Sequence, residues 1–390
     1  MSFSMRRPIE SYSNQVSRAA EYKITTILHS PKGKRSAFDG VNLFFSYLCT
    51  NFESKIFESQ MKKILGIGSA LVDILTQIPN DQILNELNLP KGSMTYVNAD
   101  DAVKIGDKVA QQFGSQRASG GSTANTMCGL SRLGVETGFL SKIGKDEVGE
   151  FFKKQMIDCN VKPQLLTTET PSGRVIAMVT PDGERTFATC LGAAIEMGPD
   201  DIHPDLLDGW DIFYVEGYLV ANPPLLEKAI DTAHAKGMTI AMDMASYNEV
   251  AKHRDLLLRL LEDRLDIVFA NEQEAQTLTG LEDPEAALHY IAERCQIAVV
   301  KVGAKGAYIQ RGDEVVTIPP MPANVIDTTG AGDVWASGFL AGLVKGEPLQ
   351  KCGMMGAIVA KNIIEVMGAK MDDTRWDNLH KAIAELGIQN

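Results

Sequence analysis

The segment Asp327-Thr-Thr-Gly-Ala-Gly-Asp333 has the residue types of a site that transfers a phosphoryl group. Apolar residues follow Asp333 at helical spacing up to Gly346, which predicts that a glycine-rich turn opens a helix here. Small residues let the backbone approach a ligand closely, and the first N–H groups of a helix favour a phosphate. A carboxylate at Asp333 could then accept the proton of an attacking hydroxyl. The alternative is a tight turn whose aspartate only caps the helix, and this short motif alone does not decide between them.

A second glycine turn, Gly120-Gly121-Ser-Thr-Ala-Asn125, opens another predicted helix, which ends at Gly134. Asn125 lies one turn into this helix and offers a donor and an acceptor to a hydroxyl, although alone it could be an ordinary polar position. Asp73 follows the strand predicted at 64–68 and lies in an otherwise apolar run. An aspartate there is either a turn residue or a ligand for substrate hydroxyls.

Two further groups follow predicted strands, where open parallel sheets place ligand-binding residues. Helical spacing puts Asn271 and Glu274 on one face, where they could hold a hydrated Mg²⁺, an ion that needs few protein carboxylates. The same N-x-x-E spacing is that of a helix capping box, so both interpretations stay open. Lys301, Gly303 and Gly306 follow the next strand and either shape a nucleotide pocket or form a strand-to-strand turn.

The elements that must position these residues alternate along the chain from Met61 onward, strand by helix. This alternation predicts a parallel sheet covered by helices, and apolar residues at consecutive positions indicate strands buried on both faces. The strands expected from such runs include 138–143, 211–215, 239–242, 266–270 and 298–302. Three other segments alternate apolar and polar residues around turn signals, which predicts a small half-exposed sheet that forms a lid. These segments are 73–78, 93–97 and 172–189.

The composition excludes several classes of partner. The chain has 390 residues, 44% of them apolar, which is enough for a sizeable core. Its formal charge of −12, without a basic stripe interleaved with aromatics, argues against nucleic-acid and anionic-membrane partners. The six cysteines are widely spaced and form no CxxC pair, which argues against zinc and favours a reduced, cytoplasmic compartment. No apolar stretch near the N-terminus approaches the roughly 20 residues of a membrane-spanning helix.

Residues 1–60 show no sustained periodicity, so we expect an N-terminal extension there and a single domain from Met61 to residue 390. The extension could be disordered, a transit peptide or the product of a start codon assigned too early. Glu10 and Glu21 are atypical of a transit peptide, but the sequence does not separate these alternatives.

The order Asp73, GGxxxN, NxxE, GxxG, DTTGAGD resembles that of the ribokinase family, also called the PfkB carbohydrate kinases. The resemblance covers Met61 to the C-terminus, and its two signature regions match at 120–149 and 327–340. One departure is Val334-Trp335, where relatives often carry Ala-Phe, which alters packing near the helix start and leaves Asp333 untouched. The resemblance implies an α/β fold with a three-layer α/β/α ribokinase-like core and a small β-sheet lid.

The resemblance also implies transfer of the γ-phosphoryl group of ATP, with Mg²⁺, to an alcohol of a small-molecule nucleoside or sugar. It makes Asp333 the base and Gly330, Ala331 and Gly332 the anion hole. The residues it assigns to the acceptor are Asp73, Gly120, Gly121 and Asn125, and those it assigns to the nucleotide and magnesium are Asn271, Glu274, Lys301, Gly303 and Gly306. It further implies potassium activation through Asp327 and Thr329. We expect a monomer or a homodimer.

The acceptor is expected to be adenosine, converted to AMP. Four stretches are more similar to the adenosine-kinase-like branch than to ribokinase or fructokinase: LPKGSMT, GGSTANT, TPDGERT and VEGYL, which begin at positions 89, 120, 180 and 215. A sugar kinase of ribokinase or fructokinase type is the alternative.

Two other classes compete with a kinase. A dehydrogenase would use Gly66-Ile-Gly68, but position 71 is leucine where GxGxxG needs a glycine. A catalytically silent sugar- or nucleoside-binding protein with the same fold is the more serious rival, because a fold does not prove an activity. The retained Asp333 and its full glycine loop argue against it.

Overall fold

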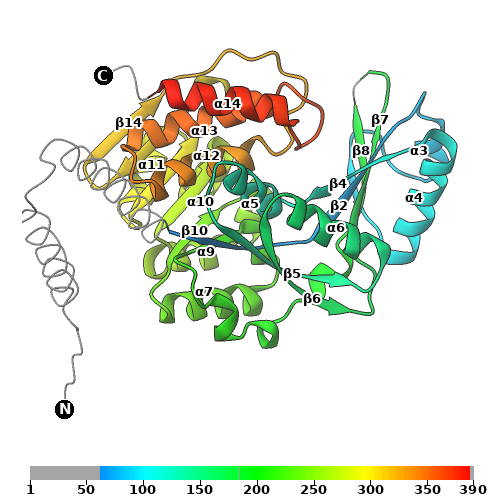
Figure 1. The fold of residues 1–390 in the computed structure, drawn as a ribbon, viewed down its shortest axis with the longest axis horizontal. Coiled ribbons are helices and arrows are strands. Elements are labelled where there is room, and N and C mark those ends of the chain that lie inside the picture. Colours follow the sequence, from blue (N-terminus) through cyan, green and yellow to red (C-terminus); the bar gives the residue numbers. More distant parts are fainter. Residues whose placement is uncertain (1–61, 183, 387–390) are drawn as a thin grey trace, which may run out of the picture. The chain divides into compact units, whose positions relative to one another are not determined.

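Two β-sheets organise the part of the chain that the computed structural model describes, residues 62–182 and 184–386 (Figure 1). The larger sheet has nine strands in the order β14-β13-β12-β11-β10-β9-β1-β5-β6. They are β1 (Ile64–Ile67), β5 (Thr137–Gly144), β6 (Val161–Thr168), β9 (Ile212–Glu216), β10 (Thr239–Asp243), β11 (Ile267–Asn271), β12 (Ile297–Lys301), β13 (Ala307–Arg311) and β14 (Glu314–Ile318). The strands from β12 to β6 pair in parallel, and β13 and β14 add an antiparallel edge. The five strands predicted from apolar runs are confirmed as β5 and β9 to β12.

Helices cover both faces of the larger sheet, because successive side chains of a strand point to opposite sides. On β9, for example, Tyr214 packs into one hydrophobic core and Phe213 into the other. The first core includes residues of α5 (Ser122–Arg132), α6 (Glu147–Asp158), α12 (Ala331–Val344), α13 (Leu349–Ile363) and α14 (Asp373–Glu385). The second includes residues of α7 (Pro223–Ala235), α8 (Tyr247–Lys252), α9 (Arg254–Asp263), α10 (Glu272–Thr279) and α11 (Pro284–Ala292). The predicted three-layer α/β/α core is therefore confirmed.

Short 3₁₀ helices complete the connections, at Gly192–Glu196, Pro199–Asp201, Pro204–Leu207, Gly217–Ala221 and Gly303–Lys305.

The smaller sheet has five strands in the order β3-β8-β7-β2-β4. They are β2 (Leu71–Gln77), β3 (Met94–Tyr96), β4 (Gln116–Gly120), β7 (Gly173–Val179) and β8 (Arg185–Cys190), with α3 (Gln82–Glu86) and α4 (Ala99–Phe113) between the strands. The segments expected to form a lid coincide with β2, β3 and the β7–β8 hairpin. We did not predict β4, because Gln-Arg-Ala-Ser-Gly has too few apolar residues to show alternation.

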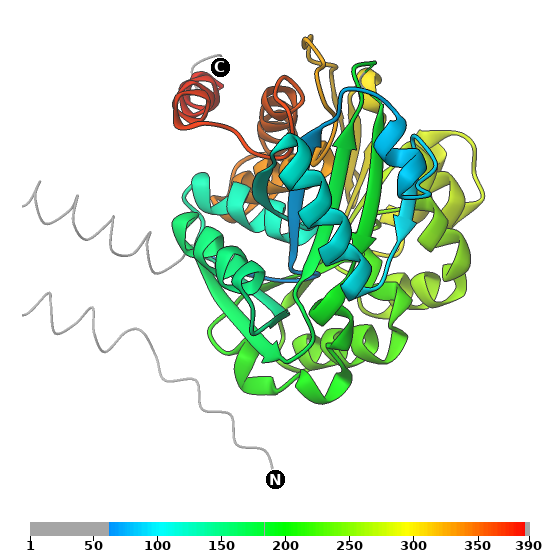
Figure 2. The ribbon, with the colours of Figure 1, turned by 90° about the vertical axis from the view of Figure 1, so that its right-hand side faces the viewer.

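The two faces of the small sheet differ. Ile74 of β2 and Ile176 of β7 lie under α4, close to Gly106, and Figure 2 shows α4 (cyan) in front of the strands. Asp73 and Leu75, the neighbours of Ile74, point the other way and line a cavity. The alternation of β2 thus separates a helix-covered face from a face that is free to cover a ligand.

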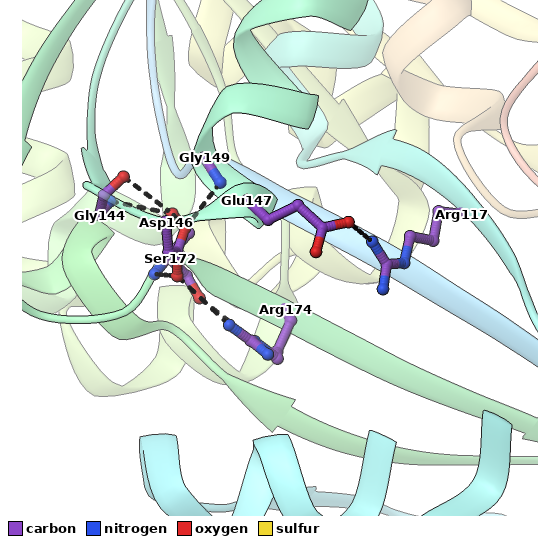
Figure 3. Close-up of polar contacts among 7 residues, drawn as sticks. All are labelled: Arg117, Gly144, Asp146, Glu147, Gly149, Ser172 and Arg174. Atoms are coloured by element: carbon purple, nitrogen blue, oxygen red, sulfur yellow. Dashed lines mark hydrogen bonds and ion pairs between the residues drawn. The ribbon is translucent and has the colours of Figure 1, made fainter. Parts of the chain in front are cut away.

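A polar cluster ties the small sheet to the core (Figure 3). Asp146, the N-cap of α6, accepts hydrogen bonds from Gly149 N at 2.8 Å and from Ser172 N at 2.9 Å. Its carboxylate also accepts from Ser172 Oγ at 2.6 Å and lies 3.4 Å from Arg174 of β7. The beginning of β7 is thereby held to the first turn of α6.

The predicted extension, residues 1–60, lies outside the described residues. Within residues 62–182 and 184–386, no helix combines the length and apolar character that crossing a membrane requires.

Candidate active site

A cavity of about 1350 Å³ is lined by the uncovered face of the small sheet and by residues that end the parallel strands of the larger sheet. Its wall includes these predicted site residues: Asp73, Gly121, Asn125, Asn271, Glu274, Lys301, Gly303, Gly306, Thr329, Gly330, Ala331, Gly332 and Asp333. Gly120 and Asp327 were also predicted and lie beside wall residues rather than in the wall. Residues that are far apart in the sequence are thus brought to one site.

The predicted glycine turn does open a helix. Gly330 is the N-cap of α12 and has φ 74°, a left-handed conformation that glycine adopts without strain. A Cβ at Gly330 would also come within 2.8 Å of the Ala369 side chain. Ala331, Gly332 and Asp333 form the first helical turn, whose N–H groups have no partner within the helix. Ala331 N donates to Thr328 O at 3.2 Å, so the N–H groups of Gly332 and Asp333 are those that the helix leaves open to an anion.

Two side chains of α5 hold the carboxylate of Asp333. Ser122 Oγ donates to Oδ1 at 2.7 Å, and Asn125 Nδ2 donates to Oδ2 at 3.0 Å. Burial raises the pKa of Asp333 to about 6, against the lowering effect of these two hydrogen bonds. The group is therefore ionised at neutral pH but basic enough to take up a proton.

Asp73 lies on β2 opposite Ala118, with its carboxylate over Gly120 of β4. A Cβ at Gly120 would come within 2.5 Å of both carboxylate oxygens, so only glycine leaves room for Asp73. Burial raises the pKa of Asp73 to about 6, and the positive charge of Lys370 opposes this rise. Lys370 Nζ also donates to Ser119 Oγ at 2.8 Å.

Asn125 is bonded to Asp333 and keeps one acceptor unused. Its Nδ2 is used by Asp333, while its Oδ1 is buried and has no hydrogen-bond partner among the described residues. Buried acceptors are normally paired, so this oxygen is free to accept from a ligand hydroxyl.

The Asn271–Glu274 pair does form a capping box. Asn271 Oδ1 accepts from Glu274 N at 2.9 Å, and Glu274 Oε2 accepts from Asn271 N at 2.8 Å. Both residues also line the cavity, so the cap does not remove them from the site. Burial, reinforced by the charge of Asp243, raises the pKa of Glu274 to about 7.

A hydrated divalent cation fits beside Glu274, because burial next to Asp243 disfavours ionisation of this carboxyl group and a nearby positive charge would favour it. In the described ranges, no three His, Cys, Asp or Glu side chains lie close enough together to coordinate a metal ion directly.

A buried ion pair lies at the ends of β10 and β12, and only one of its two residues, Lys301, was predicted as a site residue. Lys301 Nζ lies 2.8 Å from Asp243 Oδ2, and the two side chains are 14% and 7% exposed. The ammonium group also lies 3.2 Å from the position that a Cβ of Gly332 would take. A positive charge is thus fixed next to the glycine turn that opens α12. Asp243 carried the same signal as Asn271, a polar residue ending an apolar strand, but the sequence analysis did not single it out.

Gly303 and Gly306 form the connection between the antiparallel strands β12 and β13 and also line the cavity. Gly306 has φ 103°, and a Cβ there would collide with the carbonyl oxygen of Ile318. This segment is therefore both a strand-to-strand turn and part of the cavity wall.

Glu216 and Ser122 were not predicted as site residues. Glu216 ends β9, is 2% exposed, and accepts from Thr123 N at 3.2 Å and from Ser69 N at 3.4 Å. It therefore holds the first turn of α5, from which Ser122 and Asn125 reach Asp333. Burial raises the pKa of Glu216 to about 7.

Asp327 and Thr329, the residues expected to hold potassium, are engaged by an arginine. Arg185 of β8 places one guanidinium nitrogen 2.7 Å from Asp327 Oδ2 and donates from another to Thr329 Oγ1 at 2.9 Å. As they stand, these two side chains do not fit a potassium ion.

The departure at Val334-Trp335 places an indole in the hydrophobic core. Trp335 is buried, stacks on Phe339 with ring centroids 5.6 Å apart, and contacts Phe269 edge to face. A Cβ at Gly356 would come within 2.9 Å of the indole, so α13 approaches Trp335 closely. The hydrogen bonds of Asp333 do not involve this residue.

Comparison with known proteins agrees with this geometry. The family model described as "pfkB family carbohydrate kinase" matches residues 89–375. The crystal structure of adenosine kinase from Sinorhizobium meliloti has 34% sequence identity and a TM-score of 0.72, over 83% of this chain and 99% of that one. A probable sugar kinase from Rhizobium etli has 34% identity and a TM-score of 0.73, over the same shares. A protein named cytidine kinase from Thermococcus kodakarensis is 30% identical over 64% of this chain and 88% of its own length.

The fold, the glycine turn beside Asp333 and the matched residues agree on one assignment. The chain belongs to the pfkB family of carbohydrate kinases and is a phosphotransferase that acts on an alcohol group of a sugar or nucleoside.

Proposed function

We propose that this kinase transfers the γ-phosphoryl group of ATP to adenosine and produces AMP. The observation that carries the proposal is the composition of the cavity. Its wall combines Asp73 and Asn125, whose side chains can bind hydroxyls, with several apolar side chains of the small sheet.

The small sheet lines the cavity with the polar residues Gln116, Arg117 and Ser119 and with a larger apolar group: Leu75, Met94, Ala118, Val175, Ala177 and Phe187. A free sugar carries hydroxyls around its whole ring and would leave some of them unpaired against these apolar side chains, which costs free energy. A nucleoside places its ribose hydroxyls at one end and an apolar base face at the other. The cavity therefore favours a nucleoside over ribose or fructose.

In this proposal Asp73 accepts hydrogen bonds from the ribose hydroxyls, and the free Oδ1 of Asn125 accepts another. Gly120 and Gly121 contribute by their small size. Gly120 leaves room for the Asp73 carboxylate, and Gly121 has φ 94°, with no space for a Cβ against the carbonyl oxygen of Ser69. The ribose is thereby held close to the first turn of α5.

Asp333 acts as the base. It accepts the proton of the primary hydroxyl as the hydroxyl oxygen attacks the γ-phosphorus, and the bond to the bridging oxygen breaks to release ADP. The hydrogen bonds from Ser122 and Asn125 fix the direction of the carboxylate. The backbone of Gly330, Ala331 and Gly332 stabilises charge on the transferring oxygens.

Lys301 adds a fixed positive charge on the phosphate side, held in place by Asp243. Asn271 and Glu274 would hold the water shell of Mg²⁺, which supplies charge neutralisation to the nucleotide phosphates. Gly303 and Gly306 leave the cavity wall open for the nucleotide.

A sugar kinase is the second candidate, because the relative from Rhizobium etli is described as a probable sugar kinase at the same identity as the adenosine kinase. The test is a substrate panel. Purified protein is incubated with ATP and Mg²⁺ and with adenosine, cytidine, ribose or fructose, and ADP release is measured together with the phosphorylated product. We expect kcat/KM for adenosine to exceed that for either free sugar by at least about 10²-fold. A preference for ribose or fructose would refute the nucleoside proposal.

A further inference from the structure

Arg185 reaches from the small sheet to the loop that precedes α12. It lies at the first position of β8, and its guanidinium contacts both Asp327 and Thr329. The contact is largely buried, since the side chains of Arg185 and Asp327 are 19% and 5% exposed. An arginine that contacts two oxygens in this way is a geometrically defined partner rather than a loose surface charge.

The carboxylate of Asp327 has no acceptor capacity left. Its Oδ1 accepts from Thr329 N at 3.0 Å and from Thr329 Oγ1 at 2.7 Å. Its Oδ2 accepts from Gly368 N at 2.6 Å and from Arg185 at 2.7 Å. A carboxylate offers about four acceptor sites, and all of them are used. Although burial alone would raise it, these hydrogen bonds hold the pKa of Asp327 below its ordinary value.

A monovalent cation at Asp327 and Thr329 would therefore have to displace a donor and lie against a guanidinium. The guanidinium of Arg185 already supplies a positive charge to this loop. We propose that Arg185 is a positioning residue that takes the place of a monovalent cation at Asp327 and Thr329, so that this kinase does not require potassium. The activity measurement of this inference rests on the proposed function. The stability measurement does not, because it needs no substrate.

Removing Arg185 should create the site that it now fills. Arg185→Ala leaves a buried carboxylate without its charged partner, which is strongly unfavourable. Asp327 and the Thr329 hydroxyl then offer oxygen ligands of the kind that hard cations bind. The variant is expected to recruit potassium from solution and to be stabilised by it.

The experiment compares wild type, Arg185→Ala and Arg185→Lys in potassium chloride and in tetramethylammonium chloride at equal ionic strength. The matched control is Glu147→Gln, which breaks another ion pair between the core and the small sheet, Arg117–Glu147 at 2.8 Å. Each protein is measured twice: by the initial rate with adenosine and ATP, and by thermal unfolding without substrate. The unfolding measurement needs no acceptor, so it decides the inference even if adenosine is not the substrate.

We expect wild type and Glu147→Gln to differ by less than about two-fold in rate between the salts, with unchanged unfolding temperatures. Arg185→Ala should lose at least about 10-fold in tetramethylammonium, recover with potassium, and unfold at a temperature that rises with potassium concentration. Arg185→Lys keeps the charge, so its rate and unfolding temperature should not respond to potassium. A lysine variant that potassium activates or stabilises would overturn the inference, and this test holds even if the alanine variant does not fold. Saturable potassium activation of wild type would overturn the inference, as would an Arg185→Ala variant that responds to potassium in neither measurement.

Discussion

Ser122 donates a 2.7 Å hydrogen bond to Asp333 across 211 positions of sequence. The bond joins the first turn of α5 to the first turn of α12, so the two helices meet at one carboxylate. Its consequence is electrostatic, because a hydrogen bond to the charged form of a carboxyl lowers its pKa.

The pH dependence of kcat/KM for adenosine should show an acid limb near the pKa of Asp333, about 6. Asp333 must be ionised to accept a proton, so activity falls as the pH drops through that value. Asp73 also has a pKa of about 6, so two carboxylates are protonated over the same pH range. The fall in kcat/KM should therefore be steeper than the fall that a single protonation would cause. Ser122→Ala removes a hydrogen bond that lowers the pKa of Asp333, so the limb should move to higher pH.

The pH profile is measured at saturating ATP and Mg²⁺, with Ser131→Ala on the same helix as the control. A limb that stays in place in Ser122→Ala would show that this hydrogen bond does not tune the base.

Asp73 should discriminate adenosine from 2′-deoxyadenosine. An analogue that lacks one hydroxyl leaves a buried polar group unpaired, which costs about 1 to 3 kcal/mol. The deoxy compound should therefore be the poorer substrate of wild type, and Asp73→Ala should reduce turnover of adenosine most and shrink the difference. The measurement is kcat/KM for both compounds in both proteins. Equal kcat/KM values for the two nucleosides in wild type would defeat the role of Asp73.

Gly120→Ala should reproduce the effect of losing Asp73 without removing the carboxylate. The new Cβ would come within 2.5 Å of both Asp73 oxygens and push that side chain out of place. We expect a higher KM for adenosine and an unchanged KM for ATP. Gly198→Ala is the matched control, because Gly198 has φ −123° and nothing within 4 Å of a Cβ. If Gly120→Ala binds adenosine normally, the close approach is not a constraint on the site.

Lys301→Met should lower the free energy of unfolding by about 3 to 5 kcal/mol, because Asp243 becomes a buried charge without a partner. Adding Asp243→Asn should restore part of this loss. Lys305→Met, which breaks the exposed Lys305–Glu272 contact at 3.6 Å, should change stability by less than about 0.5 kcal/mol. Chemical denaturation gives the free energy of unfolding of wild type, Lys301→Met, the double variant and Lys305→Met. A double variant no more stable than Lys301→Met would contradict the pairing.

Local patterns in the sequence were sufficient for much of the fold and for the chemistry-bearing loops. Consecutive apolar residues identified β9 to β12 because these strands are buried on both faces. Glycine followed by helical periodicity placed Gly330 at the start of α12 and Gly121 at the start of α5. Such signals are readable because each is contained within about one turn or one strand of chain.

The residues that the sequence analysis missed act through partners far along the chain. Arg185 meets Asp327, Asp243 meets Lys301, and Glu216 meets Thr123, and no local period connects the members of these pairs. Strand β4 was missed for another reason, since an edge strand of Gln, Arg, Ala, Ser and Gly has no apolar stripe to detect. Tertiary pairing, rather than local propensity, decides these positions.

Turnover of Asp333→Asn tests the proposed mechanism most directly, since that mechanism assigns the proton transfer to this carboxylate. The amide keeps the size of the side chain and loses its basicity. We expect kcat with adenosine to fall by at least about 10²-fold while ATP binding, measured by calorimetry, stays within about three-fold of wild type. Asp283→Asn, at the N-cap of α11, is the control and should retain full activity. An Asp333→Asn variant that turns over at nearly the wild-type rate would contradict the account.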